Sequence, residues 1–245
     1  YKFLFLPIKN NTFQIQCKIF GGTFLENKNN CGISHLAEHM ITNAWDKCYK
    51  GGCTEYMEQY GTVSNAHTRQ NDTEYWVRGL SNFKYIMIDY ILSCVLNPTF
   101  TQKTMDREIE AVKNEIKNAT NAPDYELLKT ANFVFNKNPG MKYSRDRMEQ
   151  IKNLKTFSLK DIVDFTKKVV KLKKMLFIIS GHYKRGDVIK HINKVIDTFP
   201  KTTVPSNTIN INFKTCYNIE KRVVYINNKK NKTAHVLLVF PLDFY

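Results

Sequence analysis

The stretch His35-Leu36-Ala37-Glu38-His39 carries the most information about this chain of 245 residues. On a helix, residues four apart lie one turn apart on the same face, so both imidazoles can bind one metal ion. Glu38 can then point at a water molecule on that ion without being a ligand itself. The stretch therefore predicts a helix, from about residue 33 to 45, that presents a catalytic zinc site. The alternative is a polar helix face with two exposed histidines.

A third protein ligand should come from another rigid element. Two histidines leave a catalytic zinc ion one protein ligand short, and that ligand is usually a carboxylate. Residues 101–120 read TQKTMDREIEAVKNEIKNAT, which contains good helix formers and neither Gly nor Pro. Glu108 and Glu115 are seven residues apart, so they lie two turns apart on one face of the predicted helix. The alternative for both is an ordinary solvated helix face.

On these residues the chain resembles the pitrilysin/insulinase family of inverted-zincin metallopeptidases, and within it the N-terminal catalytic half of mitochondrial processing peptidases. The family motif is H-x-x-E-H, followed much later by two glutamates seven residues apart. The resemblance implies that His35, His39 and Glu115 bind one zinc ion per chain. It also implies that Glu38 is the general base and that Glu108 assists catalysis by orienting a ligand.

A second part of the resemblance concerns substrate binding. Residues 61–68 read GTVSNAHT and look like the Asn-Ala-x-Thr strand that lies beside the zinc in this family. In relatives this edge strand receives the substrate backbone, which implies substrate binding at Asn65 and Ala66. A peptide bound in this way would be extended and would add a strand to the sheet. The alternative for Asn65 is a structural residue at a turn or a strand end.

The order of predicted elements indicates an α+β fold, with a mainly antiparallel sheet and helices packed on one face. Residues 2–7 and 12–21 are predicted to form a hairpin with Asn10-Asn11 as its turn. Further strands are predicted at 61–68, 73–80 and 175–181. Further helices are predicted at 54–60, 85–96, 101–120, 161–168 and 187–199.

The chain is predicted to contain more than one unit. Residues 1–203 form the zinc-binding catalytic domain, and 204–212 form a linker. Residues 213–245 are interpreted as the opening hairpin of a second homologous half, or as strands that close the first sheet. Because the chain begins with Tyr1, we expect a piece of a longer protein. The missing C-terminal half, or a homologous partner subunit, is therefore an expected partner.

Composition narrows the range of partners and settings. The net charge of +15 suggests that the chain binds nucleic acid. The lysines, however, are spread along the chain and no known nucleic-acid-binding motif accompanies them, so we do not expect a nucleic-acid partner. No apolar stretch is long enough to span a bilayer, so we do not expect a membrane as a partner of this chain. The six cysteines include no C-x-x-C pair. This favours reduced thiols and an intracellular setting, with a disulfide between Cys48 and Cys53 as the alternative.

The leading functional hypothesis is a zinc-dependent endopeptidase that cleaves extended peptides or small unfolded proteins. The second is a non-catalytic scaffold or partner subunit of the same fold. Such relatives usually lose a ligand or the base, whereas this chain keeps all four residues. The third is a basic nucleic-acid-binding protein in which the histidine motif is incidental.

Overall fold

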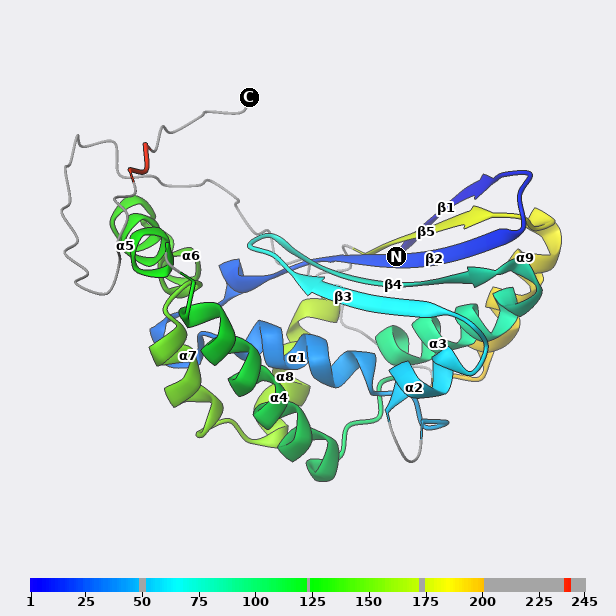
Figure 1. Cartoon of the computed structure of the whole chain (residues 1–245). Helices are drawn as coiled ribbons and strands as arrows, with labels where there is room; N and C mark the ends of the chain where they lie inside the picture. Colours follow the sequence, from blue (N-terminus) through cyan, green and yellow to red (C-terminus); the bar gives the residue numbers. More distant parts are fainter. Residues whose placement is uncertain (49–51, 123, 172–174, 201–235, 239–245) are drawn as a thin grey trace.

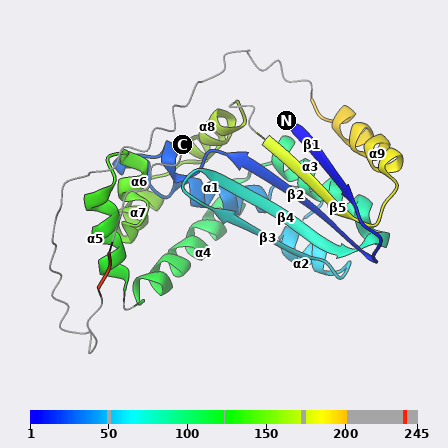
Figure 2. The same cartoon turned by 90° about the horizontal axis from the view of Figure 1, so that it is seen from above.

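A sheet covered on one face by helices is the framework of the molecule (Figure 1). The computed structural model describes residues 1–48, 52–122, 124–171, 175–200 and 236–238. Its five strands are β1 Lys2–Pro7, β2 Thr12–Phe20, β3 Val63–Thr68, β4 Asp72–Leu80 and β5 Met175–Gly181. Their order across the sheet is β1-β5-β2-β4-β3 (Figure 2). Only the β1–β5 pairing is parallel among these described strands, so the predicted α+β fold with a mainly antiparallel sheet is confirmed.

The predicted hairpin between the first two strands is wrong. β5 lies between them, with Leu4 opposite Ile178 on one side and Gln16 opposite Ile178 on the other. Two strands with a third strand between them are about 10 Å apart, and four extended residues span about 13 Å. The connection through Asn10 and Asn11 is therefore long enough to cross over the end of β5. A short polar connection gives no local sign that a distant strand will insert.

The helices of the described residues form the second layer. They are α1 Ile33–Thr42, α2 Cys53–Glu58, α3 Lys84–Leu96, α4 Gln102–Thr120, α5 Tyr125–Phe135, α6 Pro139–Tyr143, α7 Arg147–Leu154, α8 Leu159–Lys171 and α9 Arg185–Asp197. The predicted metal helix thus ends at Thr42, three residues before the predicted end. None of these helices is long and apolar enough to cross a bilayer.

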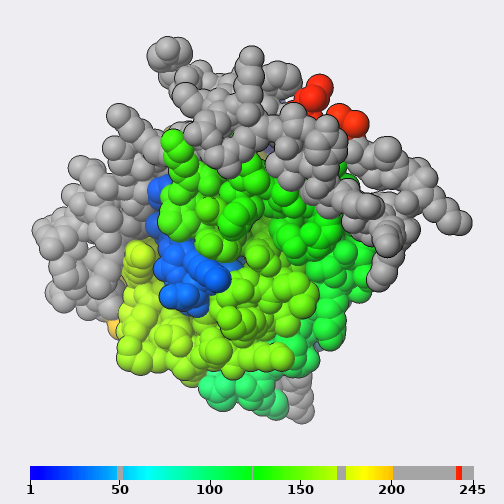
Figure 3. Space-filling model, turned by 90° about the vertical axis from the view of Figure 1, so that its left-hand side faces the viewer, coloured from blue at the N-terminus to red at the C-terminus, as the bar shows by residue number. Residues whose placement is uncertain are grey.

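The core lies between the sheet and the helices. β2 alternates buried and partly exposed residues, and its buried side chains, from Phe13 to Ile19, face the helical layer. α1, α3 and α8 contact the sheet directly, whereas α4 packs on α1. Helices α5, α6 and α7 continue from α4 and form one end of the molecule. There α6 and α7 pack against the segment around residues 23–30, seen as the blue surface in Figure 3.

The expectation of reduced thiols is wrong at one pair. Cys48 and Cys53 form a disulfide, with their Cα atoms 4.9 Å apart, a separation that a disulfide accommodates. Helix α2 begins at Cys53, which brings this residue back to the end of the loop that follows α1. Cys17, Cys31 and Cys94 are buried free thiols. The predicted intracellular setting therefore loses part of its support.

The predicted boundaries between the catalytic domain, the linker and the second half fall outside the described residues. The linker at 204–212 lies outside the described residues. So does the predicted second half from 213 onward, apart from 236–238. The division into units stays a prediction.

Candidate metal centre

Helix α1 begins in a way that depends on one glycine and one buried carboxylate. Gly32 precedes the helix with φ +97°, a backbone conformation that residues with a Cβ atom rarely adopt. No side chain at the N-cap position accepts a hydrogen bond. Instead the carboxylate of Glu26 accepts N–H groups from Gly32 at 3.1 Å and from Ser34 at 2.8 Å. Glu26, which lies outside the helix, therefore caps its N-terminus and fixes where the helix that carries the two histidines begins.

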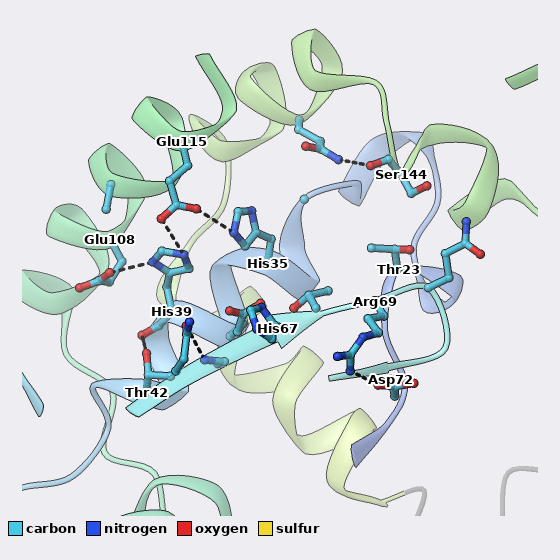
Figure 4. A pocket seen from close by; sticks show the side chains of 18 of the residues that line it. Thr23, His35, His39, Thr42, His67, Arg69, Asp72, Glu108, Glu115 and Ser144 are labelled. Atoms are coloured by element: carbon cyan, nitrogen blue, oxygen red, sulfur yellow. Dashed lines mark hydrogen bonds and ion pairs between the residues drawn. The ribbon is translucent and has the colours of Figure 1, made fainter. Parts of the chain in front are cut away.

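Three side chains from α1 and α4 converge, as Figure 4 shows. Nε2 of His35 lies 3.3 Å from Oε2 of Glu115, and Nε2 of His39 lies 3.6 Å from Oε1 of the same carboxylate. The two imidazole rings lie 4.9 Å apart between centroids, as expected for residues one helical turn apart. One donor atom from each residue can be chosen so that all lie within 4.8 Å of one another.

These positions fit a zinc ion. Tetrahedral zinc binds nitrogen and oxygen ligands at about 2.0–2.2 Å, which places two ligand atoms about 3.4 Å apart. The distances from Nε2 of His35 and of His39 to one or the other oxygen of Glu115, 3.3 and 3.6 Å, are close to that value. Two imidazoles and one carboxylate are also the donor set of several catalytic zinc sites, and they leave a fourth position open.

Glu108 lies one layer behind these donors. Its side chain is only 8% exposed, and its Oε2 accepts a hydrogen bond from Nδ1 of His39 at 3.1 Å. Its Oε1 accepts hydrogen bonds from Nε of Arg107 at 2.8 Å and from Nδ2 of Asn43 at 3.3 Å. These bonds hold the carboxylate in place. Glu108 thereby leaves Nε2 of His39 directed toward Glu115.

Sequence reasoning missed the contributions of Asn43 and Arg107. Asn43 follows the last residue of α1, where its Nδ2 donates to the carbonyl of His39 at 3.1 Å. Its Oδ1 accepts the N–H of Cys53 at 3.1 Å, which ties α1 to the start of α2 beside the disulfide. An asparagine at the end of a helix is a recognisable sign of a capping role. Nothing in the sequence distinguishes Arg107 from other exposed helix cations.

The contacts change the protonation of the metal-free centre. Burial lowers the pKa of His39, but hydrogen bonds with Glu108 and Glu115 outweigh this and raise the pKa to about 9. Hydrogen bonds from His35 and His39 hold the pKa of Glu115 well below its usual range. Burial raises the pKa of Glu108, but the bonds from His39 and Arg107 outweigh it and lower the pKa. A proton therefore occupies the centre at neutral pH, and an incoming metal ion must displace it.

Glu38 lines the same cleft and differs from the other carboxylates. Its residue is 8% exposed, and it lies on α1 next to His39. Among the described residues, none donates a hydrogen bond to its carboxylate or forms an ion pair with it. A carboxylate without a protein donor is available to a water molecule in the cleft.

The predicted substrate strand forms the other border of the cleft. β3 lies at the edge of the sheet, so its outer N–H and C=O groups have no neighbouring strand among those described. Asn65 and Ala66 both line the cleft, which has a volume of about 1100 Å³. In this structure Oδ1 of Asn65 accepts the N–H of Ala66 at 2.8 Å. The side chain of Asn65 therefore covers one of the edge donors that an added strand could use.

Comparison with known proteins places this chain in a family. The model of Insulinase (Peptidase family M16) matches residues 8–139, more than half of the chain. A probable mitochondrial-processing peptidase subunit beta of Arabidopsis thaliana is 22% identical over 189 residues, 76% of this chain and 35% of that protein. An uncharacterized zinc protease of Rickettsia bellii is 25% identical over 180 residues, 72% of this chain and 42% of that protein. The chain spans less than half the length of these relatives.

A solved structure supports the same assignment at the level of the fold. A protease from Helicobacter pylori superimposes with a TM-score of 0.71 at 16% sequence identity, covering 83% of this chain and 50% of that chain. The family model covers three of the five strands, α1 and α4, and this match leads to one conclusion. The chain belongs to the insulinase family of peptidases, family M16.

Proposed function

We propose that the chain is the metal-binding part of a zinc-dependent endopeptidase that acts on extended peptides or small unfolded proteins. The observation that carries the proposal is the convergence of His35, His39 and Glu115 in a cleft that also contains Glu38. His35, His39 and Glu115 would hold the zinc ion. When bound, zinc supplies a Lewis acid that polarises a carbonyl group and lowers the pKa of a water molecule.

In this proposal Glu38 is the general base. Its carboxylate takes a proton from the attacking water and later delivers it to the leaving amine. Lying on the same helix as both histidines, it keeps a fixed position relative to them. Glu108 would hold His39 in one orientation and so act as a positioning residue.

The edge strand β3 would bind the substrate. A peptide that pairs with β3 lies along the cleft, which Asn65 and Ala66 line. The N–H of Ala66 then exchanges its hydrogen bond with Asn65 for one with the substrate backbone. Because main-chain groups make these contacts, binding selects an extended conformation.

A second half of the protein, or a homologous partner subunit, would complete the enzyme. Two matched proteins are named as mitochondrial-processing peptidase subunits beta, from Arabidopsis thaliana and Saccharomyces cerevisiae. The chain spans 35% and 42% of these proteins. No specific observation favours the scaffold or nucleic-acid hypotheses over the peptidase.

The test of this function is Glu38→Gln in the protein that contains this chain. We expect the variant to keep its zinc and to lose about 10²–10⁴-fold in peptide cleavage, since the base no longer accepts a proton. Zinc content and cleavage of an unstructured peptide are measured on the same preparations. Glu58→Gln, a change of the same kind outside the cleft lining, is the control and should keep full activity. Unchanged cleavage by Glu38→Gln would contradict the proposed mechanism.

A further inference from the structure

The wall of the cleft opposite the metal centre carries positive charge. Figure 4 shows Ser144 and Arg69 on the side of the pocket away from His39 and Glu115. Arg145 and Arg147 follow Ser144 closely in the chain, and they also line the cleft. This wall is built by the connection between α6 and α7 and by the β3–β4 turn. It therefore comes from elements that take no part in the metal centre.

Arg145 and Arg147 have no acidic partner within the described chain. Neither guanidinium lies within 4.0 Å of a carboxylate of a described residue. Arg69, by contrast, pairs with Asp72 at 3.2 Å and with Glu74 at 2.5 Å. Of the three arginines in the wall, two thus keep their charge available to a ligand.

Arg147 is held in a fixed position. It is half-buried, and its Nη1 donates to Oε1 of Gln150 at 3.2 Å. Gln150 is only 3% exposed, and its Nε2 donates to the carbonyl of Ser144 at 2.9 Å, which orients the amide. The N–H of Arg147 donates to the hydroxyl of Tyr125 at 3.0 Å. The buried amide of Gln150 thus holds the guanidinium at the cleft without neutralising it, while the hydroxyl of Tyr125 holds the backbone of Arg147.

The environment of Arg147 makes an unpaired charge costly. Burial lowers its pKa, and the neighbouring charge of Arg145 lowers it further, against the opposing effects of Tyr125 and Glu115. A guanidinium stays charged in proteins, so the cost is carried by the folded state. A bound anion would offset this cost and satisfy the remaining N–H groups.

The acidic residues of the cleft are already occupied or belong to the metal centre. Glu26 accepts two N–H groups at the start of α1, and Asp72 pairs with Arg69 and with Lys18. The other acidic residues in the lining are Glu38, Glu108 and Glu115. Charge that faces a ligand away from the metal centre is therefore positive.

We propose that Arg145 and Arg147 bind a carboxylate of the substrate, so that the enzyme favours acidic peptides. This inference rests on the proposed peptidase function and names the substrate class. The carboxylate comes from an Asp or Glu side chain beside the bond to be cleaved, or from the C-terminus of a short peptide. A planar guanidinium donates two parallel hydrogen bonds to a carboxylate, which gives direction as well as attraction.

The test measures peptide binding separately from cleavage. Three ten-residue peptides are used: one with Asp residues and an amidated C-terminus, its Asn counterpart, and the Asn peptide with a free C-terminal carboxylate. Binding to the Glu38→Gln protein is followed by fluorescence anisotropy, with zinc and again with a chelator. The chelated samples exclude direct binding of a carboxylate to the metal ion.

The variants remove both charges together, or the charge of Arg145 alone. In Arg145→Gln/Arg147→Gln we expect the preference for carboxylate peptides, about tenfold or more, to disappear. Lys184→Gln/Arg185→Gln removes two exposed cations at the start of α9 and should keep the preference. Arg145→Gln alone changes an exposed residue, so it tests the site without disturbing the bonds of Arg147.

The outcomes separate this inference from the proposed function. Equal binding of all three peptides, with normal cleavage, would overturn the carboxylate site and leave the peptidase intact. A preference that persists in the double variant would overturn the site as well. Arginine-dependent binding of the Asp peptide by a protein that never cleaves peptides would support the site and contradict the peptidase. A stronger effect of the free C-terminus than of Asp side chains would identify the terminal carboxylate as its ligand.

Discussion

The floor of the cleft and its open side use carboxylates in opposite ways. On the floor, Glu108 and Glu26 are buried, and N–H donors of the protein hold them in place. On the open side, the side chain of Glu115 is 55% exposed and pairs, among the described residues, with the two histidines, whereas Glu38 is itself buried but has no donor there. The difference indicates that the two groups of carboxylates have different roles. Carboxylates bonded to N–H groups of the surrounding framework fix the shape of the cleft, whereas Glu115 and Glu38 remain available to a metal ion or a water molecule.

The largest expected effect comes from removing the open carboxylate that joins both histidines. We expect Glu115→Ala to lose zinc, with a fall in affinity larger than the about 10–100-fold typical of residues that only support a ligand. Because the side chain is exposed, the free energy of unfolding in chelator should change by about 1 kcal/mol or less. Zinc content after dialysis and urea unfolding measure the two quantities.

A matched control exists on the same helix. Glu110 is exposed and pairs with Lys113 at 2.6 Å on α4, away from the metal centre. Glu110→Ala should keep the zinc content of the unchanged protein. If both variants keep zinc, the open carboxylate is not a ligand, and the contrast with the floor has no functional meaning.

The sequence predicted the open side better than the floor. His35, Glu38 and His39 follow from a local motif, because helical spacing alone places them on one face. The two glutamates of α4 were found at the right spacing, but only the fold shows that one is buried and the other exposed. The capping role of Glu26 depends on a loop that returns to α1, which no local pattern encodes.

The misplaced hairpin and the missed wall of the cleft have the same physical origin. β5 inserts between β1 and β2 although it lies far along the chain, so the local hairpin pattern was misleading. The far wall of the cleft, with Arg145 and Arg147, is also assembled from segments that are distant from the motif. The resemblance to a family supplied the zinc ligand on α4. It gave no information on which charges remain unpaired in this particular chain.

A second prediction tests whether burial of the Glu26 carboxylate lowers the free energy of unfolding. Burial raises the pKa of Glu26 to about 7 from an ordinary value of 4.5, although bonds from Ser34 and Gly32 oppose it. The folded state then binds this proton more tightly than the unfolded state. Stability from this group is therefore full below about pH 4.5 and falls as the pH rises to about 7, by about 3 kcal/mol in total.

The measurement is urea unfolding between pH 4.5 and 8 for the unchanged protein and Glu26→Gln, both in chelator. The variant should show a flatter dependence on pH across this window, because it has no proton to lose at this position. Glu110→Gln serves as the exposed control and should not flatten it. Parallel curves for all three proteins would show that Glu26 keeps an ordinary pKa and that the capping bonds compensate fully for its burial.

The smallest expected effect concerns the buried partner of His39. Glu108→Gln keeps the shape of the side chain and one acceptor oxygen, but it removes the negative charge that faces Nδ1 of His39. We expect zinc affinity to fall by about 10–100-fold, less than in Glu115→Ala, because all three ligand atoms remain. Competition with a zinc-binding dye gives both values on one scale. Equal losses in the two variants would mean that the floor binds the metal as directly as the open side does, and the contrast between them would then be wrong.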